Sequence, residues 1–239
     1  MISLKNKKIV IVGASSGIGK ALASTVSAQG AIVYLVSRSK EKLLKVQEEL
    51  PGESYVFSMD MLDDDSVNHT FEAIGHFDFL TFTAVADETK LMAPIKTMSN
   101  ETAQRGMEKF WGTFNVARAA SNHISKDGAM VFTSSMAIYR PSKNGASMMN
   151  AASAAVAVFS KALALEIAPV RINVVAPGVV ATGVWTKDQK ENYKEWAAKT
   201  LPVGHLGSAE ELANAYLSLL INPYMTGSVV TVDGGLSLV

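Results

Sequence analysis

Three glycines stand where an apolar segment gives way to a helical pattern. The run Val12–Gly19 follows the predicted strand Lys8–Val12 and opens the predicted helix Ile18–Gln29. Glycines allow the backbone to approach a pyrophosphate closely, and a helix N-terminus directs N–H groups and its positive dipole end at the phosphates. This turn therefore predicts that the chain binds a nucleotide.

A second group with chemical potential is the tyrosine–lysine pair Tyr139 and Lys143. A free phenol, with a pKa of about 10, is a poor base at neutral pH unless a cation lies beside it. On a helix, the i, i+4 spacing would bring the two side chains to one face. Pro141 removes a helix donor and disfavours helical geometry at Arg140, and Gly145 follows closely. Two interpretations stay open, a catalytic pair and a surface loop.

The predicted strand Ile32–Ser37 is followed by Arg38 and Ser39. A site for NAD usually has an acidic residue here that accepts a hydrogen bond from the ribose 2′-hydroxyl. An arginine can instead pair with a 2′-phosphate through two parallel hydrogen bonds, and Ser15 and Ser39 can add hydroxyl donors. We therefore expect NADP(H) to be preferred over NAD(H). The alternative is an exposed Arg38 that serves only solubility.

Short β-branched segments alternate with longer helical patterns along the whole chain. Such alternation predicts parallel strands joined by right-handed helical crossovers, and continuously apolar strands predict helices on both faces of the sheet. We expect an α/β fold, a Rossmann-like doubly wound parallel sheet of about seven strands, with residues 1–239 forming a single domain. The predicted strands are Lys8–Val12, Ile32–Ser37, Ser54–Ser58, Phe77–Phe82, Ala129–Thr133, Arg171–Val175 and Val229–Val232, and the predicted helices are Ile18–Gln29, Lys40–Leu50, Asp63–Ile74, Asn100–His123, Gly145–Ala168 and Ala209–Ile221.

The composition narrows the range of partners. The 239 residues carry 22 basic and 22 acidic side chains, so no basic excess favours a nucleic-acid partner. No signal-peptide pattern is seen, and no apolar run is long enough to span a membrane. The chain has no cysteine, and its four histidines lack metal-ligand spacing, so we expect no metal site. A cytoplasmic protein that acts on a small molecule fits these features.

The segment Ala181–Gly207 is too long for a plain connection between the sixth strand and the last helix. It carries Trp185, Tyr193 and Trp196. A lid over a ligand and a packed excursion without function are the two interpretations.

The chain resembles the short-chain dehydrogenase/reductase family over its whole length. The resemblance rests on the glycine pattern G-x-x-x-G-x-G, on Asn173–Gly178 with Thr182 after it, and on Thr226–Gly235. It implies that Asp60 contacts the adenine and that the segment around Pro177 lies beside the nicotinamide. The cofactor-binding residues that we expect are Gly13, Ser15, Ser16, Gly17, Ile18, Gly19, Arg38, Ser39, Asp60, Met61, Ala84, Pro177, Gly178, Val180 and Thr182.

The usual catalytic residues of the family are replaced in this chain. Members use a Tyr, a Lys four residues later, a Ser, and an Asn that holds a water. Ser135 best matches the serine, while the register of Ala162–Glu166 puts the Tyr position at Met149 and the Lys position at Ser153. Methionine has no exchangeable proton and serine has no charge, so the ordinary Tyr/Lys relay is not expected.

Two further departures lie near these positions. The family's Asn-Asn-Ala-Gly after the fourth strand is Phe82–Val85 here, which predicts a different backbone path beside the cofactor. Lys109 stands where the family's Asn belongs, in the matching segment Lys109–Phe114. We hypothesise that the Lys109 ammonium enters the site vacated at Ser153 and bonds the nicotinamide ribose or a substrate oxygen. The alternative is that Lys109 pairs with an acid or extends its charged end to solvent.

The resemblance implies an NADP(H)-binding oxidoreductase that transfers hydride on a carbonyl/alcohol substrate. Ser135 and Lys109 would polarise the substrate oxygen, with water as the proton source. The alternatives are a catalytically inactive NADP(H)-binding sensor or interaction module, and an isomerase or dehydratase that uses the same cleft. Helices Asn100–His123 and Gly145–Ala168 match subunit-interface helices of the family and are rich in small residues, so we expect a homodimer or homotetramer.

Overall fold

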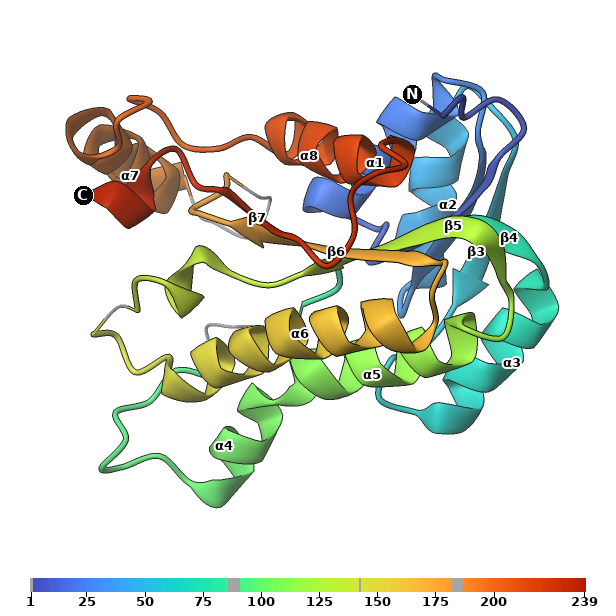
Figure 1. Cartoon of the computed structure of the whole chain (residues 1–239). Coiled ribbons are helices and arrows are strands. Elements are labelled where there is room, and N and C mark those ends of the chain that lie inside the picture. Colours follow the sequence, from blue (N-terminus) through green and yellow to red (C-terminus); the bar gives the residue numbers. More distant parts are fainter. Residues whose placement is uncertain (1, 86–90, 142, 182–186) are drawn as a thin grey trace.

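The computed structural model describes residues 2–85, 91–141, 143–181 and 187–239 (Figure 1). Its centre is one sheet of seven strands in the order β3-β2-β1-β4-β5-β6-β7, with every neighbouring pair parallel. Strand order reverses between β1 and β4, and in open α/β sheets ligands bind outside the carboxyl ends of the strands at such a point. The strands are β1 (Lys8–Val12), β2 (Ile32–Ser37), β3 (Ser54–Ser58), β4 (Phe77–Phe82), β5 (Ile124–Thr133), β6 (Arg171–Pro177) and β7 (Val229–Val232).

Helices cover both faces of the sheet (Figure 1). Alternate residues of β1 enter opposite cores, with Ile9 and Ile11 in one and Val10 and Val12 in the other. The first core is closed by α1, α2 and α8, and the second by α3, α5 and α6. The predicted doubly wound α/β class is confirmed. The helices are α1 (Gly17–Ser27), α2 (Lys40–Glu49), α3 (Asp64–Ile74), α4 (Asn100–Gly106), α5 (Glu108–Ala120), α6 (Ser147–Glu166), α7 (Lys187–Thr200) and α8 (Ala209–Ile221), with short 3-10 helices η2 (Met136–Ile138) and η3 (Leu236–Leu238).

The single helix predicted over Asn100–His123 is wrong. Two helices, α4 and α5, meet at Met107, whose N–H bonds the carbonyl of Gln104 three residues back. Gly106 precedes the break, and a Cβ there would lie 2.6 Å from Met148 Cβ on α6. The glycine weakens the helix at this point, and it lets α4 approach α6 closely.

Two further differences from the prediction concern β5 and α7. β5 begins at Ile124, five residues before the predicted start, but its register with β4 shifts and becomes regular only at Ala129. Helix α7 was not predicted within Ala181–Gly207. Its sequence is mostly polar, and its apolar contacts come from a small cluster that includes Ala197 and Leu201. With so few apolar residues, this helix has no periodic pattern to recognise.

Helix α6 is long and apolar enough, by length and composition, to cross a membrane, contrary to the sequence-based expectation. Within the fold it is a packed helix, because Ala152, Val156 and Leu163 are buried and the helix lies along α5 and beneath the sheet (Figure 1). Length and composition alone therefore do not distinguish this helix from a membrane span.

Candidate functional site

The turn between β1 and α1 is a backbone cradle that needs its glycines. Gly13 has a φ of +96°, and a Cβ on it would lie 2.5 Å from the backbone nitrogen of Ala84. A Cβ on Gly19 would collide with the carbonyl oxygen of Gly13. The turn thus packs directly against the loop that follows β4, and no larger residue fits at either position.

The first turn of α1 fits a phosphate group. Ser16 is the N-cap of α1, its side chain makes no capping hydrogen bond, and the first turn carries no acidic residue. By contrast, Ser39 and Asp63 cap α2 and α3 by accepting from backbone N–H groups. The start of α1 therefore offers N–H donors and the positive end of the dipole to an anion.

The residues predicted to bind the adenosine end lie at the same edge of the sheet. Arg38 follows β2 and is exposed, and its carbonyl accepts a hydrogen bond from Ser58 Oγ at the end of β3 (3.0 Å). Asp60 accepts from the N–H of Leu62 at 3.0 Å. The side chain of Met61 instead lies against α5, where a Cβ on Gly112 would be 2.7 Å from Met61 Cγ.

The predicted nicotinamide side is built from the end of β6. Pro177 pairs with Val232 of β7, and a Cβ on Gly178 would lie 2.6 Å from Cα of Asp233. Val180 forms an isolated parallel bridge with Gly207, next to a 2.8 Å bond from the N–H of Ala181 to the Gly207 carbonyl. The two ends of the segment 181–207 are therefore pinned together. Thr182 and Trp185 lie outside the described residues.

Lys109 reaches Ser153, the residue that we expect at the position of the family's lysine. Its Nζ donates to the carbonyl of Ser134 at 2.8 Å and to Ser153 Oγ at 3.4 Å. Ser134 Oγ in turn donates to the carbonyl of Ser153 at 2.8 Å, which ties the end of β5 to α6. Lys109, Met149 and Ser153 line one small pocket. The ammonium thus lies beside Ser153, as the hypothesis that Lys109 enters this site requires, and Met149 lines the same pocket.

Ser135 follows directly after this tied segment. Its Oγ accepts a hydrogen bond from the N–H of Ala137 at 3.2 Å and so begins η2. That contact uses a lone pair of the oxygen, and the hydroxyl proton can still donate to a ligand. Ser135 lies at the carboxyl edge of β5, the edge of the sheet that also carries the glycine turn.

The pair Tyr139 and Lys143 does not share a helix. Tyr139 ends η2 with 55% of its surface exposed, Lys143 is exposed, and α6 begins only at Ser147. Neither side chain belongs to the described lining of the Lys109 pocket. The neighbouring Arg140 donates to the carbonyl of Leu236 at 2.7 Å, which anchors the C-terminal turn. This geometry favours the surface-loop interpretation of the pair.

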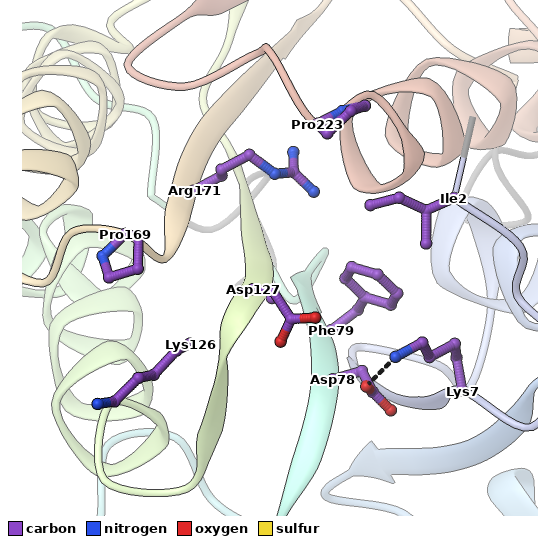
Figure 2. Close-up of a pocket in the computed structure, with 10 residues that line it drawn as sticks. Ile2, Lys7, Asp78, Phe79, Lys126, Asp127, Pro169, Arg171 and Pro223 are labelled. Carbon is purple, nitrogen blue, oxygen red and sulfur yellow. Dashed lines mark hydrogen bonds and ion pairs between the residues drawn. The ribbon is translucent and has the colours of Figure 1, made fainter.

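A larger cavity of about 590 Å³ lies at the amino ends of β1, β4, β5 and β6 (Figure 2). Lys7, Asp78 and Arg171 of its lining have structural partners that the sequence did not reveal. Lys7 pairs with Asp78 at 2.6 Å, and this hydrogen bond raises the pKa of Lys7. The Arg171 guanidinium donates to the Leu219 and Leu220 carbonyls at the end of α8, and burial lowers its pKa. Arg171 therefore caps α8.

Among the residues that the structure describes, no group of three or more histidine, aspartate or glutamate side chains could hold a metal ion. The cradle at Gly13–Gly19 and the Lys109 pocket remain as the candidate site.

The fold and the glycine cradle define a doubly wound α/β protein with a phosphate-binding turn at the switch point of its sheet. A family model described as Enoyl-(Acyl carrier protein) reductase matches residues 13–237. The human 3-oxoacyl-(acyl-carrier-protein) reductase is 31% identical over 241 aligned residues, covering 98% of this chain and 99% of that protein. The chain belongs to the short-chain dehydrogenase/reductase family.

Two of the solved structures that share this fold are complexes with NADPH. A small-chain dehydrogenase in complex with NADPH has a TM-score of 0.81 and 30% identity, covering 98% of this chain and 100% of that one. L-Sorbose reductase from Gluconobacter frateurii, complexed with NADPH and L-sorbose, has a TM-score of 0.88 and 26% identity, with 100% of both chains covered.

Proposed function

We propose that this chain is an NADP(H)-dependent oxidoreductase that transfers hydride between the cofactor and a carbonyl/alcohol pair of a small-molecule substrate. The names of its relatives support the reaction class, since they are reductases, and two structural neighbours hold NADPH. The absence of cysteine fits a cytoplasmic location, which is part of the proposal.

The cofactor would bind along the carboxyl edge of the sheet. The backbone of Gly13–Gly19 would hold the pyrophosphate, because the uncapped start of α1 offers its N–H groups there. Arg38, with Ser15 and Ser39, would bind the 2′-phosphate, and the end of β6 at Pro177 would face the nicotinamide. The bound dinucleotide supplies or accepts the hydride; the protein must bind the substrate oxygen and manage its proton.

The observation that carries the proposal is the position of the Lys109 ammonium. It lies 3.4 Å from Oγ of Ser153, the residue that replaces the family's lysine. Lys109 would therefore bring a cation to the position at which Ser153 carries none. A fixed cation stabilises the negative charge that develops on the substrate oxygen during carbonyl reduction. Ser135 would donate its hydroxyl proton to the same oxygen, and water would provide the transferred proton.

One observation favours the alternative, an inactive NADP(H)-binding module. Met149 lines the pocket at the position of the family's tyrosine, and its thioether cannot exchange a proton. In that case the cofactor would act through occupancy, by setting the position of the segment 181–207 or a subunit interface.

A binding and transfer experiment separates these functions. We expect the protein to bind NADPH and, with deuterium at C4 of the cofactor, to transfer deuterium stereospecifically to at least one compound in a broad carbonyl panel. Product analysis by mass spectrometry and NMR measures the transfer. NADPH binding with no oxidation across the panel would instead favour the module.

We also propose a homodimer or homotetramer that uses α5 and α6. Trp111 is 53% exposed, and Val158 and Leu165, seven residues apart on α6, are 68% and 82% exposed. Phe159 makes an edge-to-face contact with Phe110 in the same region. These side chains form an apolar surface between two neighbouring helices, which fits a helix-packing interface with a second copy.

Replacing Val158 by aspartate should therefore shift the protein toward monomer. A charge at the centre of an apolar interface stays unpaired and loses its hydration. Light scattering coupled to size exclusion measures the mass, and Leu44→Asp on α2, which also replaces an exposed aliphatic side chain (41%), is the matched control. A wild-type protein that is monomeric at all concentrations would contradict the proposed assembly.

A further inference from the structure

The cavity at the amino ends of the strands lies at the edge of the sheet opposite to the glycine cradle (Figure 2). Its volume of about 590 Å³ is within the range of small-molecule sites, which is roughly 300–1,000 Å³. Part of its wall is apolar and is formed by Ile2, Phe79, Pro169 and Pro223. A proline has no N–H group, so the backbone at the two prolines offers no donor to a ligand. The cavity therefore suits a molecule with an apolar body.

Arg171 brings a buried positive charge to the same cavity. It begins β6, and only 7% of its surface is exposed. Its Nη1 donates to the carbonyls of Leu219 and Met225 at 2.8 and 3.3 Å, and its Nη2 donates to the carbonyl of Leu220 at 2.5 Å. A guanidinium has five N–H donors, and these contacts use three of them. Two N–H groups of Arg171 therefore have no acceptor within the part of the chain that the structure describes.

The charge of Arg171 also lacks an acidic partner. Its three acceptors are neutral carbonyl groups, and burial lowers its pKa, while no acidic side chain of the described residues raises it. A buried charge is costly unless it is paired. A carboxylate fits this role, because it can accept two parallel hydrogen bonds from the planar guanidinium. A carboxylate in the cavity would supply the partner that the described chain does not.

The other charged side chains of the lining are paired or exposed. Lys7 forms an ion pair with Asp78 at 2.6 Å. Lys126 and Asp127 are exposed, so water can solvate both charges, and the Asp127 carboxylate is close enough to Lys7 to raise its pKa further. None of these side chains is a buried charge without a partner of opposite sign. Arg171 is therefore the residue of the described lining that selects the charge of a ligand.

We propose that this cavity is a second ligand site, which binds a small carboxylic acid with an apolar body and holds its carboxylate on the Arg171 guanidinium. The carboxylate accepts from the N–H groups that the carbonyls leave unused, and the apolar body lies against the wall at Ile2 and Phe79. Arg171 keeps its contacts with the end of α8. The site is separate from the cradle at Gly13–Gly19, so the inference does not depend on the proposed function.

Three probes that share one apolar body test the charge that the cavity selects. They are phenylbutyrate, phenylbutanol and phenylbutylamine, which end in a carboxylate, a hydroxyl and an ammonium. Calorimetric titration should show that phenylbutyrate binds at least about tenfold more tightly than the other two, because only its head group pairs with a guanidinium. Equal binding of the three probes would overturn the proposal. Tightest binding of the amine would also overturn it, because Asp127 would then be the anchor.

Two variants test whether phenylbutyrate binds in this cavity. Ile2→Trp fills the space with a larger ring and leaves Arg171 and its contacts with α8 in place, so it should abolish binding. Leu44→Trp on α2, which also replaces an exposed or half-exposed aliphatic side chain, is the matched control and should bind as the wild type does. Wild-type affinity in Ile2→Trp would overturn the proposal.

The second variant, Arg171→Lys, keeps the positive charge and removes the planar fork. It should weaken phenylbutyrate binding by about tenfold or more, because a lysine cannot make two parallel hydrogen bonds to a carboxylate. Thermal unfolding measures separately how much stability is lost with the contacts to α8. A crystal structure with phenylbutyrate should show its carboxylate within hydrogen-bond distance of Arg171. Phenylbutyrate bound only at the glycine cradle would contradict the assignment of this cavity.

Discussion

Replacing Lys109 by methionine should lower kcat for NADPH-dependent reduction by about 100-fold or more, because one positioned stabiliser of a developing oxyanion contributes this much. The substitution keeps the length and apolar stem of the side chain and removes the ammonium. The carbonyl of Ser134 then loses the donor that lies 2.8 Å away, so a stability loss of about 1–3 kcal/mol should accompany the kinetic effect. Steady-state kinetics and thermal unfolding measure the two effects separately.

The control for this variant is Lys161→Met, which removes an exposed lysine from α6. A double variant, Lys109→Asn with Ser153→Lys, returns the cation to the residue that carries it in the family and should recover part of kcat. A Lys109→Met protein that keeps wild-type kcat and cofactor affinity would eliminate Lys109 from the mechanism. Recovery in the double variant would show that the charge at this place, rather than Lys109 itself, is needed.

Replacing Arg38 by glutamate should weaken NADPH binding by about 100-fold and leave NADH binding equal or tighter. Charge-assisted hydrogen bonds contribute roughly 1.5–3 kcal/mol each, and the new carboxylate repels the 2′-phosphate while it can accept from a ribose 2′-hydroxyl. Arg38 is exposed and its backbone is tied to Ser58, so the substitution leaves the sheet undisturbed. Titration of each cofactor by calorimetry or nicotinamide fluorescence measures the affinities.

Lys45→Glu is the matched control, because it reverses an exposed charge on the adjacent helix α2. It changes the net charge as much as Arg38→Glu does, so a nonspecific electrostatic effect would appear in both variants. A wild-type protein that binds NADH and NADPH equally would refute the predicted preference, and Arg38 would then be a surface residue with no part in recognition.

The sequence predicted the sheet well because each strand has its own local signal. Continuous apolar runs such as Ile32–Ser37 are needed wherever helices cover both faces, and no long-range contact is required to recognise them. The turn at Gly13 is equally local, since a strand that ends in glycines and opens a helix is typical of a phosphate-binding turn. The fold class and the cofactor cradle were therefore within reach of single-sequence reasoning.

Other features depend on contacts between distant residues. The break at Met107 follows from the close approach of Gly106 to Met148, and Arg171 caps α8 through carbonyl groups 48 and 49 residues away. The positions of backbone carbonyl groups and the distances between helices cannot be recognised from the types of the residues involved. The position of Lys109 could be hypothesised only from the resemblance to a known family. Lys109 stands in place of the family's Asn, and Ser153 stands in place of its Lys.

The bridge between Val180 and Gly207 gives the excursion between them a fixed base. A loop whose ends are already joined adds little closure entropy when its length changes, because that cost grows only slowly with the number of residues. Changes in the length and sequence of the segment between Val180 and Gly207 should thus leave the sheet and the glycine cradle unchanged. Insertion, deletion or exchange of this segment should therefore cost the rest of the fold little, which makes it a suitable unit for grafting between relatives.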